Sequence, residues 1–221
     1  MQVDIKSCIQ WAKEAEGIAV VMDVFRASNT ILSCIANGAE YIIPVGTLED
    51  AFSLKEQFPD HMLFGERYGL IAQGCEYGNS PVEASKLWLE GEKIILTTSA
   101  GSQGVVNANL ADEILVWSFA NANAIIKYIK NKNPKKVSLI AIGFNSWEIA
   151  EEDELCWKYI QAKLLWEHID FNDIRTQMLQ CSGADRLRSL HQEDDLAFCT
   201  QLDTYDIVPF YNKETKQITR V

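Results

Sequence analysis

The sequence predicts an α/β fold, a three-layer α/β/α sandwich with a mostly parallel central sheet, formed by a single domain over residues 1–221. Short apolar runs alternate with longer helical patterns, which is typical of strands that are connected by helices in a parallel sheet. The run Ile18–Met22 is apolar at every position, as expected for a strand that is buried on both faces. No linker-like stretch divides the chain, and its length suits one sizeable domain.

We expect six or more strands, taken here in chain order. The apolar runs that predict strands cover residues 3–5, 18–22, 40–45, 62–64, 93–96, 112–116, 136–142 and 207–211. Their high content of branched aliphatic residues favours strands over helices of the same length. The residues that directly follow these runs are therefore expected at one edge of the sheet.

Helical patterns lie between these runs, and several carry start and stop signals. Gly38 follows the apolar run 31–35 and is placed to end a helix in the left-handed conformation. Thr47 is expected to cap a helix over residues 48–58, with Asp50 complementing the dipole in its first turn. Further helices are expected before residue 17 and over residues 120–130, 150–169 and 195–200.

Composition and charge exclude several classes of protein. The formal net charge is -11 and the isoelectric point is about 4.8, which argues against nucleic acid or an anionic membrane as the main partner. No apolar run is long enough to span a bilayer, and we expect a cytoplasmic location. Six cysteines are scattered without a CxxC pair, so Cys34 and Cys156 are expected as reduced core residues. A homo-oligomer is left open.

The most informative polar residues follow the strand Ile18–Met22. Asp23 ends that strand and Arg26 comes three residues later. Ligands of open α/β sheets bind outside the carboxyl ends of the strands, so both residues are expected at a binding site, Arg26 as a solvent-accessible cation. The alternative is purely structural: Asp23 caps the next helix and Arg26 is its salt-bridge partner.

A glycine-punctuated stretch, residues 68–80, is expected to form a long loop and to contribute to function. It ends in Asn79, Ser80 and Pro81, with Glu83 three residues after the serine. This spacing predicts a capped helix that begins at Pro81. Ser80 is either a cap alone or part of a helix N-terminus that also binds an anion.

A second turn, residues 97–104, follows the strand 93–96 and is rich in hydroxyl groups and glycine. Such a turn before a helix is suited to holding a phosphate or sulfonate. The candidates for substrate binding are Thr98, Ser99, Gly101 and Ser102. The turn lacks the Gly-Lys-Ser/Thr of a Walker loop, so ATP is not indicated.

Four consecutive acidic residues, 151–154, open the helix expected over residues 150–169. Acidic side chains in a first helical turn usually complement the helix dipole on a solvated face. Glu152 and Asp153 are nevertheless candidates for a metal site because carboxylates follow other strands as well. In the last quarter of the chain, Asp185, Arg186 and Arg188 are left without assignment, since they can reach the site or only solvent.

Taken together, these motifs resemble those of the 2-phosphosulfolactate phosphatase family. The motifs that carry the resemblance are residues 23–28, 65–67, 78–81 and 97–102 and the pair Glu152 and Asp153 with Cys156. The resemblance covers about residues 17–156 and implies a Mg²⁺-dependent enzyme of the kind found in coenzyme M biosynthesis. It implies a small anionic phosphorylated substrate, a 2-phosphosulfolactate-like ester of a 2-hydroxy acid.

The chemistry of a phosphatase fits these residue types. Hydrolysis of a phosphomonoester needs a nucleophile or activated water and a cation that neutralises the phosphoryl oxygens. Asp23, Glu152 and Asp153 are the expected Mg²⁺ ligands, because carboxylate oxygens suit this hard cation. Asp23, Arg26 and Glu66 are the expected catalytic residues.

Arg67 and Asn79 join the expected substrate-binding residues, and a planar guanidinium matches phosphate, sulfonate or carboxylate. Phe25 stands where a haloacid dehalogenase-type phosphatase needs a second aspartate, so that mechanism is not supported. Whether Asp23 attacks phosphorus or only holds the metal stays open. The alternative function is a non-catalytic anion-binding or regulatory module on the same fold.

Overall fold

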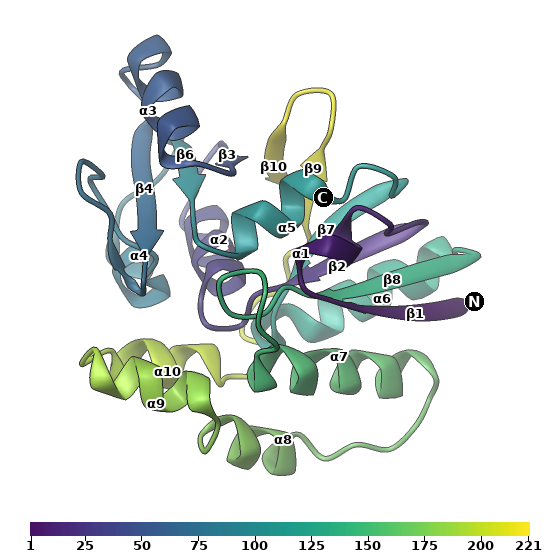
Figure 1. Cartoon of the computed structure of the whole chain (residues 1–221). Helices are drawn as coiled ribbons and strands as arrows, with labels where there is room; N and C mark the ends of the chain where they lie inside the picture. Colours follow the sequence, from purple (N-terminus) through teal and green to yellow (C-terminus); the bar gives the residue numbers. More distant parts are fainter.

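The computed structural model describes residues 1–221 and shows an α/β fold around a ten-stranded sheet (Figure 1). Across the sheet the strands lie in the order β1-β8-β2-β7-β9-β10-β3-β6-β4-β5. Their bounds are β1 Gln2–Ser7, β2 Ile18–Met22, β3 Tyr41–Val45, β4 Met62–Arg67, β5 Leu70–Ile71, β6 Lys93–Thr97, β7 Glu113–Trp117, β8 Lys136–Ala141, β9 Pro209–Asn212 and β10 Gln217–Arg220. The predicted fold class is confirmed.

The sheet consists of two parallel parts joined by an antiparallel hairpin. β1, β8, β2 and β7 pair in parallel, and so do β3, β6 and β4. The hairpin β9–β10 lies between the two parts, since β9 pairs antiparallel with β7 and β10 with β3. The link to β3 is a single pair, Ile218 with Ile42. The last strands of the chain therefore connect two units that form earlier in the sequence.

Helices cover both faces of the sheet and form the outer layers of the sandwich. Their bounds are α1 Ile9–Ala12, α2 Ala27–Ala36, α3 Leu48–Gln57, α4 Pro81–Lys86, α5 Gly101–Asn107, a 3₁₀ turn Phe119–Asn121, α6 Ala122–Lys132, α7 Glu151–Leu164, α8 Phe171–Met178, α9 Ser182–Ser189 and α10 Glu193–Cys199. In Figure 1, α9 and α10 lie beside each other at the end of α7, below α4. No helix is long and apolar enough to cross a membrane.

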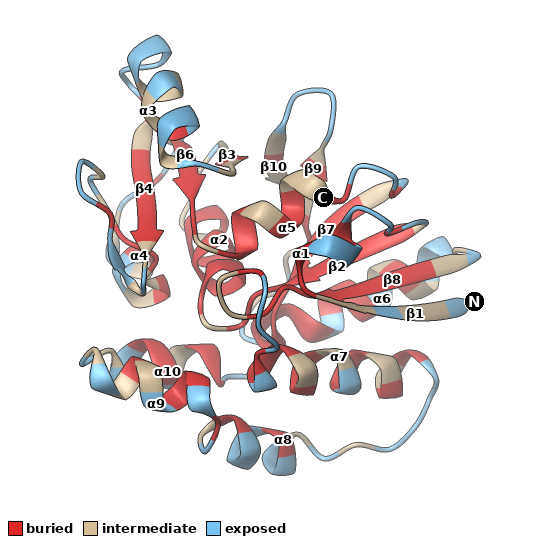
Figure 2. Ribbon diagram, viewed as in Figure 1, coloured by how far each residue is buried: buried red, intermediate tan, exposed pale blue.

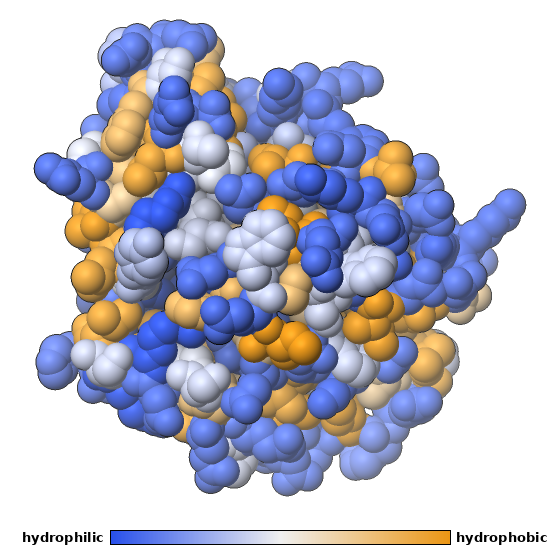
Figure 3. Space-filling model, viewed as in Figure 1, coloured by the Kyte–Doolittle hydropathy of each residue, from blue (hydrophilic) through white to orange (hydrophobic).

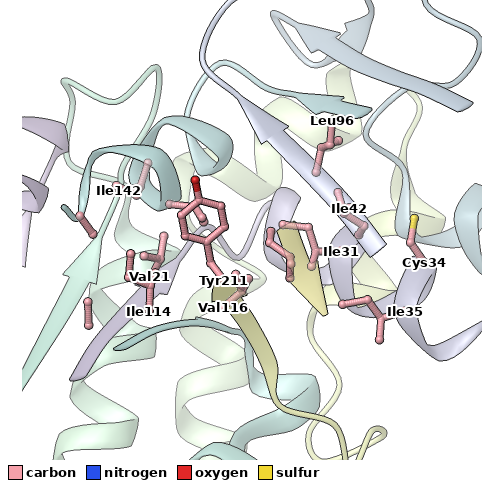
Figure 4. Close-up of a cluster of buried hydrophobic side chains, with 14 of the residues drawn as sticks. Val21, Ile31, Cys34, Ile35, Ile42, Leu96, Ile114, Val116, Ile142 and Tyr211 are labelled. Atoms are coloured by element: carbon pink, nitrogen blue, oxygen red, sulfur yellow. The ribbon is translucent and has the colours of Figure 1, made fainter. Parts of the chain in front are cut away.

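Alternate residues of β2 belong to two different hydrophobic clusters, because successive side chains of a strand point to opposite faces. Val21 packs with α2 and α5 residues such as Ile31 and Val105 in one cluster, shown in part in Figure 4. Val20 packs with α6 and α7 residues such as Ile125 in the other. Figure 2 shows the resulting buried band along the central strands. This packing fixes the position of the loop that follows β2.

Several local predictions are confirmed. The Thr47 and Ser80 side chains accept hydrogen bonds from the amides of Asp50 and Glu83, and so cap α3 and α4. Gly38 has a φ of 100°, the left-handed conformation expected after α2. All six cysteines are free, and Cys34 and Cys156 are buried.

Other element boundaries were predicted incorrectly. The strand expected over residues 62–64 continues to Arg67, so Glu66 lies within β4 rather than after it. The helix expected over 150–169 ends at Leu164, and the polar helix before residue 17 is only Ile9–Ala12. β10 was not predicted, because its four residues show no continuous apolar run.

The side of the molecule in Figure 3 is mostly hydrophilic, with hydrophobic side chains in small groups.

Candidate active site

A cavity lies at the carboxyl ends of β2, β4, β6 and β8 and is closed on one side by α9. The loops and helices that line it contribute Asp23, Phe25, Arg26, Glu66, Gly69, Asn79, Ser99, Ala100, Gly143, Phe144, Asn145, Ala150, Glu152, Asp153, Arg186 and Leu187. Asp23 and Glu66, which follow two of the predicted strand runs and were therefore expected at one edge of the sheet, lie together here with Asn79. Four carboxylates and two guanidinium groups line the cavity, a combination suited to a cation and an anionic ligand.

Asp23 follows the last residue of β2 and is held by the start of α2. Its Oδ1 accepts a hydrogen bond from the amide of Ala27 at 3.2 Å, and its own amide donates to the Ser28 hydroxyl at 3.0 Å. Its Oδ2 accepts no hydrogen bond from the protein. A methyl group on Gly101 would lie 2.8 Å from that Oδ2, so only glycine allows the approach of the two segments. Asp23 thus has one oxygen fixed and one free to bind a ligand.

Asp153 connects two of the loops that line the cavity. Its Oδ1 accepts a hydrogen bond from the amide of Val24 at 2.8 Å, and its Oδ2 accepts one from Gly143 at 2.9 Å. The loop after β2 and the loop after β8 are therefore held at a fixed separation. Glu152 and Asp153 are buried, whereas their neighbour Glu151 is exposed. The acidic cluster divides into a buried pair and two flanking residues, of which Glu151 is exposed and Glu154 is half-buried and accepts hydrogen bonds from Ser7 and Trp157.

Glu66 at the end of β4 joins two further segments. Its Oε1 accepts hydrogen bonds from the amide of Gly69 at 2.6 Å and from the Ser99 hydroxyl at 3.2 Å, and its Oε2 accepts from the Ser99 amide. Glu66 is 7% exposed. Its carboxylate consequently orders the turn after β4 and the hydroxyl-rich turn after β6 at the same time.

Arg26 differs from the sequence-based expectation of a solvent-accessible cation. It is 3% exposed, and its Nη1 contacts Asp195 of α10 at 2.6 Å while its Nη2 donates to the carbonyl oxygen of Gly69 at 2.7 Å. The structural alternative placed it beside Asp23, and that pairing is also absent. Asp195 accepts additional hydrogen bonds from the Ser80 hydroxyl and the Val82 amide. Arg26 thus ties the loop after β2 to α10 and, through Asp195, to α4.

Several predicted substrate-binding residues do not line the cavity. Thr98 and Ser102 are buried and bond to each other through amide and hydroxyl groups at the start of α5. Arg67 donates to the backbone of Glu66 and to Thr97. Ser80 is occupied by α4 and Asp195. Of the hydroxyl groups in this turn, only that of Ser99 belongs to a residue that lines the cavity, and Gly101 contributes by its lack of a side chain.

Burial raises the pKa values of the inner carboxylates, because nearby donors and cations offset only part of the cost of removing these charges from water. Desolvation, with smaller repulsion from Glu66 and Glu152, raises the pKa of Asp23 from 3.8 to about 6 despite the Ala27 amide. Desolvation and the charges of Asp23 and Glu152 raise the pKa of Asp153. The pKa of Glu152 is also raised by burial, and Arg186 opposes that shift. The cavity therefore has an excess of negative charge that a bound cation would neutralise.

The donor set fits Mg²⁺ in chemistry, although no group of three His, Cys, Asp or Glu side chains is arranged as a ready-made metal site. Mg²⁺ is usually held by one or two carboxylates, several waters and the phosphate of the substrate. The free Oδ2 of Asp23 and the neighbouring Glu152 and Asp153 meet that requirement. The uncompensated charge of these three buried groups is the structural observation that supports a cation.

Two charged residues were not assigned from the sequence: one that lines the cavity, Arg186, and one that lies behind the lining residue Arg26, Asp195. Arg186 of α9 has its guanidinium 4.2 Å from the centre of the Phe144 ring and 3.6 Å from Oε1 of Glu152. Asp195 forms the buried ion pair with Arg26. Both residues lie in short, weakly apolar helices more than 150 residues from Asp23, and no local pattern distinguishes them from solvated charges.

Comparison with known proteins then identifies the family. The family model described as 2-phosphosulpholactate phosphatase matches residues 4–214. The chain belongs to this family. A protein of Clostridium perfringens strain 13, named probable 2-phosphosulfolactate phosphatase, is 31% identical, with 91% of this chain and 89% of the relative covered. Proteins of the same name from Carboxydothermus hydrogenoformans and Thermotoga maritima are 32% and 33% identical, with 95% and 86% of this chain and 92% and 87% of the relative covered.

The family match extends well beyond the motifs that first indicate it. Those motifs end at Cys156, whereas the matched range continues to residue 214. It therefore includes α8, α9, α10 and β9, and with them Arg186 and Asp195. The match to the 2-phosphosulpholactate phosphatase model therefore covers both the strand-end loops and the helices beside the cavity.

Proposed function

We propose that this protein is a phosphoric monoester hydrolase that hydrolyses 2-phosphosulfolactate, or a closely similar phosphorylated 2-hydroxy acid, to the hydroxy acid and phosphate with the help of Mg²⁺. Family membership supports the reaction class. The observation that carries the proposal is the cavity itself, where three further carboxylates and Arg186 surround Asp23 at the end of β2. A substrate with several negative charges can enter such an acidic cavity only together with a cation.

We propose Asp23 as the main Mg²⁺ ligand, with Glu152 or Asp153 as the second. When bound, Mg²⁺ supplies charge neutralisation at the phosphoryl oxygens and lowers the pKa of a water molecule. The protein contributes orientation: two backbone amides fix Asp153, and the Ala27 amide fixes one oxygen of Asp23. Because the Ala27 amide holds Oδ1, the Asp23 carboxylate does not rotate freely, and the position of the loop sets the direction of the free Oδ2.

Hydrolysis breaks the bond between phosphorus and the ester oxygen, adds a water oxygen to phosphorus and gives a proton to the ester oxygen. A buried carboxyl with a raised pKa holds a proton more tightly than a solvated one and can donate it if it does not bind the cation. Glu152 and Asp153 are the groups of this kind beside Asp23. Ser99, ordered by Glu66, is the hydroxyl group available to the phosphoryl oxygens.

The test is a turnover assay with 2-phosphosulfolactate and a panel of other phosphomonoesters, with Mg²⁺ and with a chelator. The proposal predicts phosphate release from the 2-phosphorylated hydroxy acid that is lost on chelation and restored by Mg²⁺. Calorimetry should show weaker Mg²⁺ binding in Asp23→Asn and Asp153→Asn. Unchanged Mg²⁺ affinity in both variants would remove this cluster as the metal site.

A further inference from the structure

Arg186 is distinguished from every other basic residue near the cavity by its free hydrogen-bonding capacity. Its guanidinium donates no hydrogen bond within the protein, and its one ionic neighbour, Glu152, lies at 3.6 Å. The guanidinium packs over the Phe144 ring at 4.2 Å, and its side chain is 27% exposed. A guanidinium plane held against an aromatic ring keeps its N–H edge available for an oxyanion.

Arg26, the other basic residue of the cavity, cannot supply the same contact. Two of its three guanidinium nitrogens are taken by Asp195 and by the Gly69 carbonyl oxygen. Its charge is cancelled by a carboxylate that is itself buried. Arg67, the second arginine expected to bind an anion, donates to the protein backbone and Thr97 outside the cavity. The substrate-facing cation must therefore come from another element.

We propose that Arg186 binds an oxyanion group of the substrate, so that α9 supplies the cation that the strand-end loops lack. This inference rests on the proposed phosphatase function. Phosphoryl and sulfonate groups both present a fork of oxygens that a guanidinium can bind through two parallel hydrogen bonds. Gly183 contributes to the placement of Arg186, because a Cβ there would lie 2.4 Å from Oε1 of Glu152. Close packing of α9 on α7 thus brings Arg186 to the cavity.

The experiment compares Arg186→Lys and Arg186→Ala with the wild type on two substrates, 2-phosphosulfolactate and 2-phospholactate, which lacks the sulfonate. Arg188→Gln is the matched control, because it removes a charge from the same helix outside the cavity. We expect kcat/KM of Arg186→Lys to fall about 10- to 100-fold, since the charge stays but the fork is lost. An equal loss on both substrates places one of their shared anionic groups, the phosphoryl group or the carboxylate, at Arg186. A loss confined to 2-phosphosulfolactate places the sulfonate there.

A chemical rescue separates binding from a merely structural role. Guanidinium at millimolar concentration should restore part of the turnover of Arg186→Ala and none of that of Asp23→Asn. The proposal is overturned if kcat/KM of the Arg186 variants stays within about twofold of wild type, or if Arg188→Gln loses as much. It is also overturned if lost turnover goes with a lower Tm and is not rescued.

The oxyanion site at Arg186 and the proposed phosphatase activity can be tested separately, and either can fail while the other stands. If the wild type hydrolyses neither substrate, the phosphatase proposal fails. Calorimetry with inorganic phosphate and with sulfolactate then decides about Arg186 on its own. Weaker binding of either anion to Arg186→Ala than to Arg188→Gln supports the oxyanion site, and equal binding of both contradicts it.

Discussion

The cavity has two walls that are built in different ways. The wall formed by the ends of β2, β4, β6 and β8 and by the first turn of α7 holds Asp23, Glu66 and Asp153, and each of these carboxylates accepts at least one backbone N–H. The wall formed by α9 holds Arg186, which is positioned by packing on Phe144. A carboxylate bonded to backbone amides is fixed as long as the loop is fixed, whereas a packed guanidinium can adjust to a ligand.

The helical wall also has a separate hydrophobic core. Cys181, Ala184, Leu187 and Leu196 form a small cluster that meets the loop after β2 only through Phe25. Polar contacts complete the attachment, chiefly the buried ion pair of Arg26 with Asp195. The proposals above give the two walls different tasks: we propose that the sheet edge holds the metal and that α9 binds the substrate anion. The predictions below test that division, from the largest expected effect to the smallest.

Replacing the central carboxylate of the sheet wall should have the largest effect. We expect Asp23→Asn to lower kcat on the order of 1000-fold, because the amide loses the charge that holds the cation. Steady-state assays in saturating Mg²⁺ measure this loss. Asp206→Asn, an exposed carboxylate in the C-terminal segment, is the control and should behave as the wild type. A loss below about tenfold in Asp23→Asn would remove Asp23 from the reaction.

A side chain at Gly183 tests the close contact between α9 and the first turn of α7. We expect Gly183→Ala to lower kcat/KM about tenfold, because the new Cβ would lie 2.4 Å from Oε1 of Glu152 and must displace that carboxylate or α9. Alanine in place of glycine in the first turn of α9 would otherwise favour the helix, by up to about 1 kcal/mol. A higher Tm with unchanged kcat/KM would show that the two walls tolerate a wider separation than the account allows.

Much of the sheet wall could be predicted from the sequence because local signals reveal it. Asp23 follows a fully apolar run, and Thr47 and Ser80 precede helices at cap spacing. The helical wall could not be predicted in this way. Arg186 and Asp195 act through neighbours about 40 and 170 residues away, and a guanidinium on a short helix is usually a solvated charge. Arg26 was assigned to the ligand for the same reason, since its partner is remote in sequence.

Metal-free stability should depend on pH through the sheet wall. The pKa of Asp23 is raised from 3.8 to about 6, so the folded state binds this proton more tightly than the unfolded state does. The resulting stabilisation is complete below pH 3.8 and is lost as the pH rises through about 6. In a chelator, Asp23→Asn should be more stable than the wild type at pH 8 by about 2 to 3 kcal/mol. Urea unfolding from pH 4 to 8 measures this.

Two outcomes of that titration bear on the account. Mg²⁺ should remove most of the difference at pH 8, because the cation compensates the ionised carboxylates. If the wild type and Asp23→Asn instead lose stability in parallel across this range, Asp23 is not the group responsible for the pH dependence.

The smallest effect is expected at Ser80, which stands outside the cavity. Ser80→Ala removes the cap of α4 and one hydrogen bond to Asp195. We expect a loss of about 1 kcal/mol of stability with kcat/KM within about threefold of the wild type. Thermal unfolding and turnover on the same preparation check both values. A large loss of turnover without a change in Tm would indicate that Ser80 contacts the substrate after all.

The most direct test compares the two arginines, because Arg26 is assigned to structure and Arg186 to the substrate. Arg26→Lys should lower stability by about 2 to 3 kcal/mol, or roughly 5 to 10 °C of Tm, since the buried pair with Asp195 loses its fork. Its kcat/KM per folded molecule should stay within about fivefold of wild type. Arg186→Lys should show the opposite, a Tm within about 2 °C of wild type and kcat/KM reduced about 10- to 100-fold. Intact stability with lost turnover in Arg26→Lys, and intact turnover in Arg186→Lys, would contradict the account.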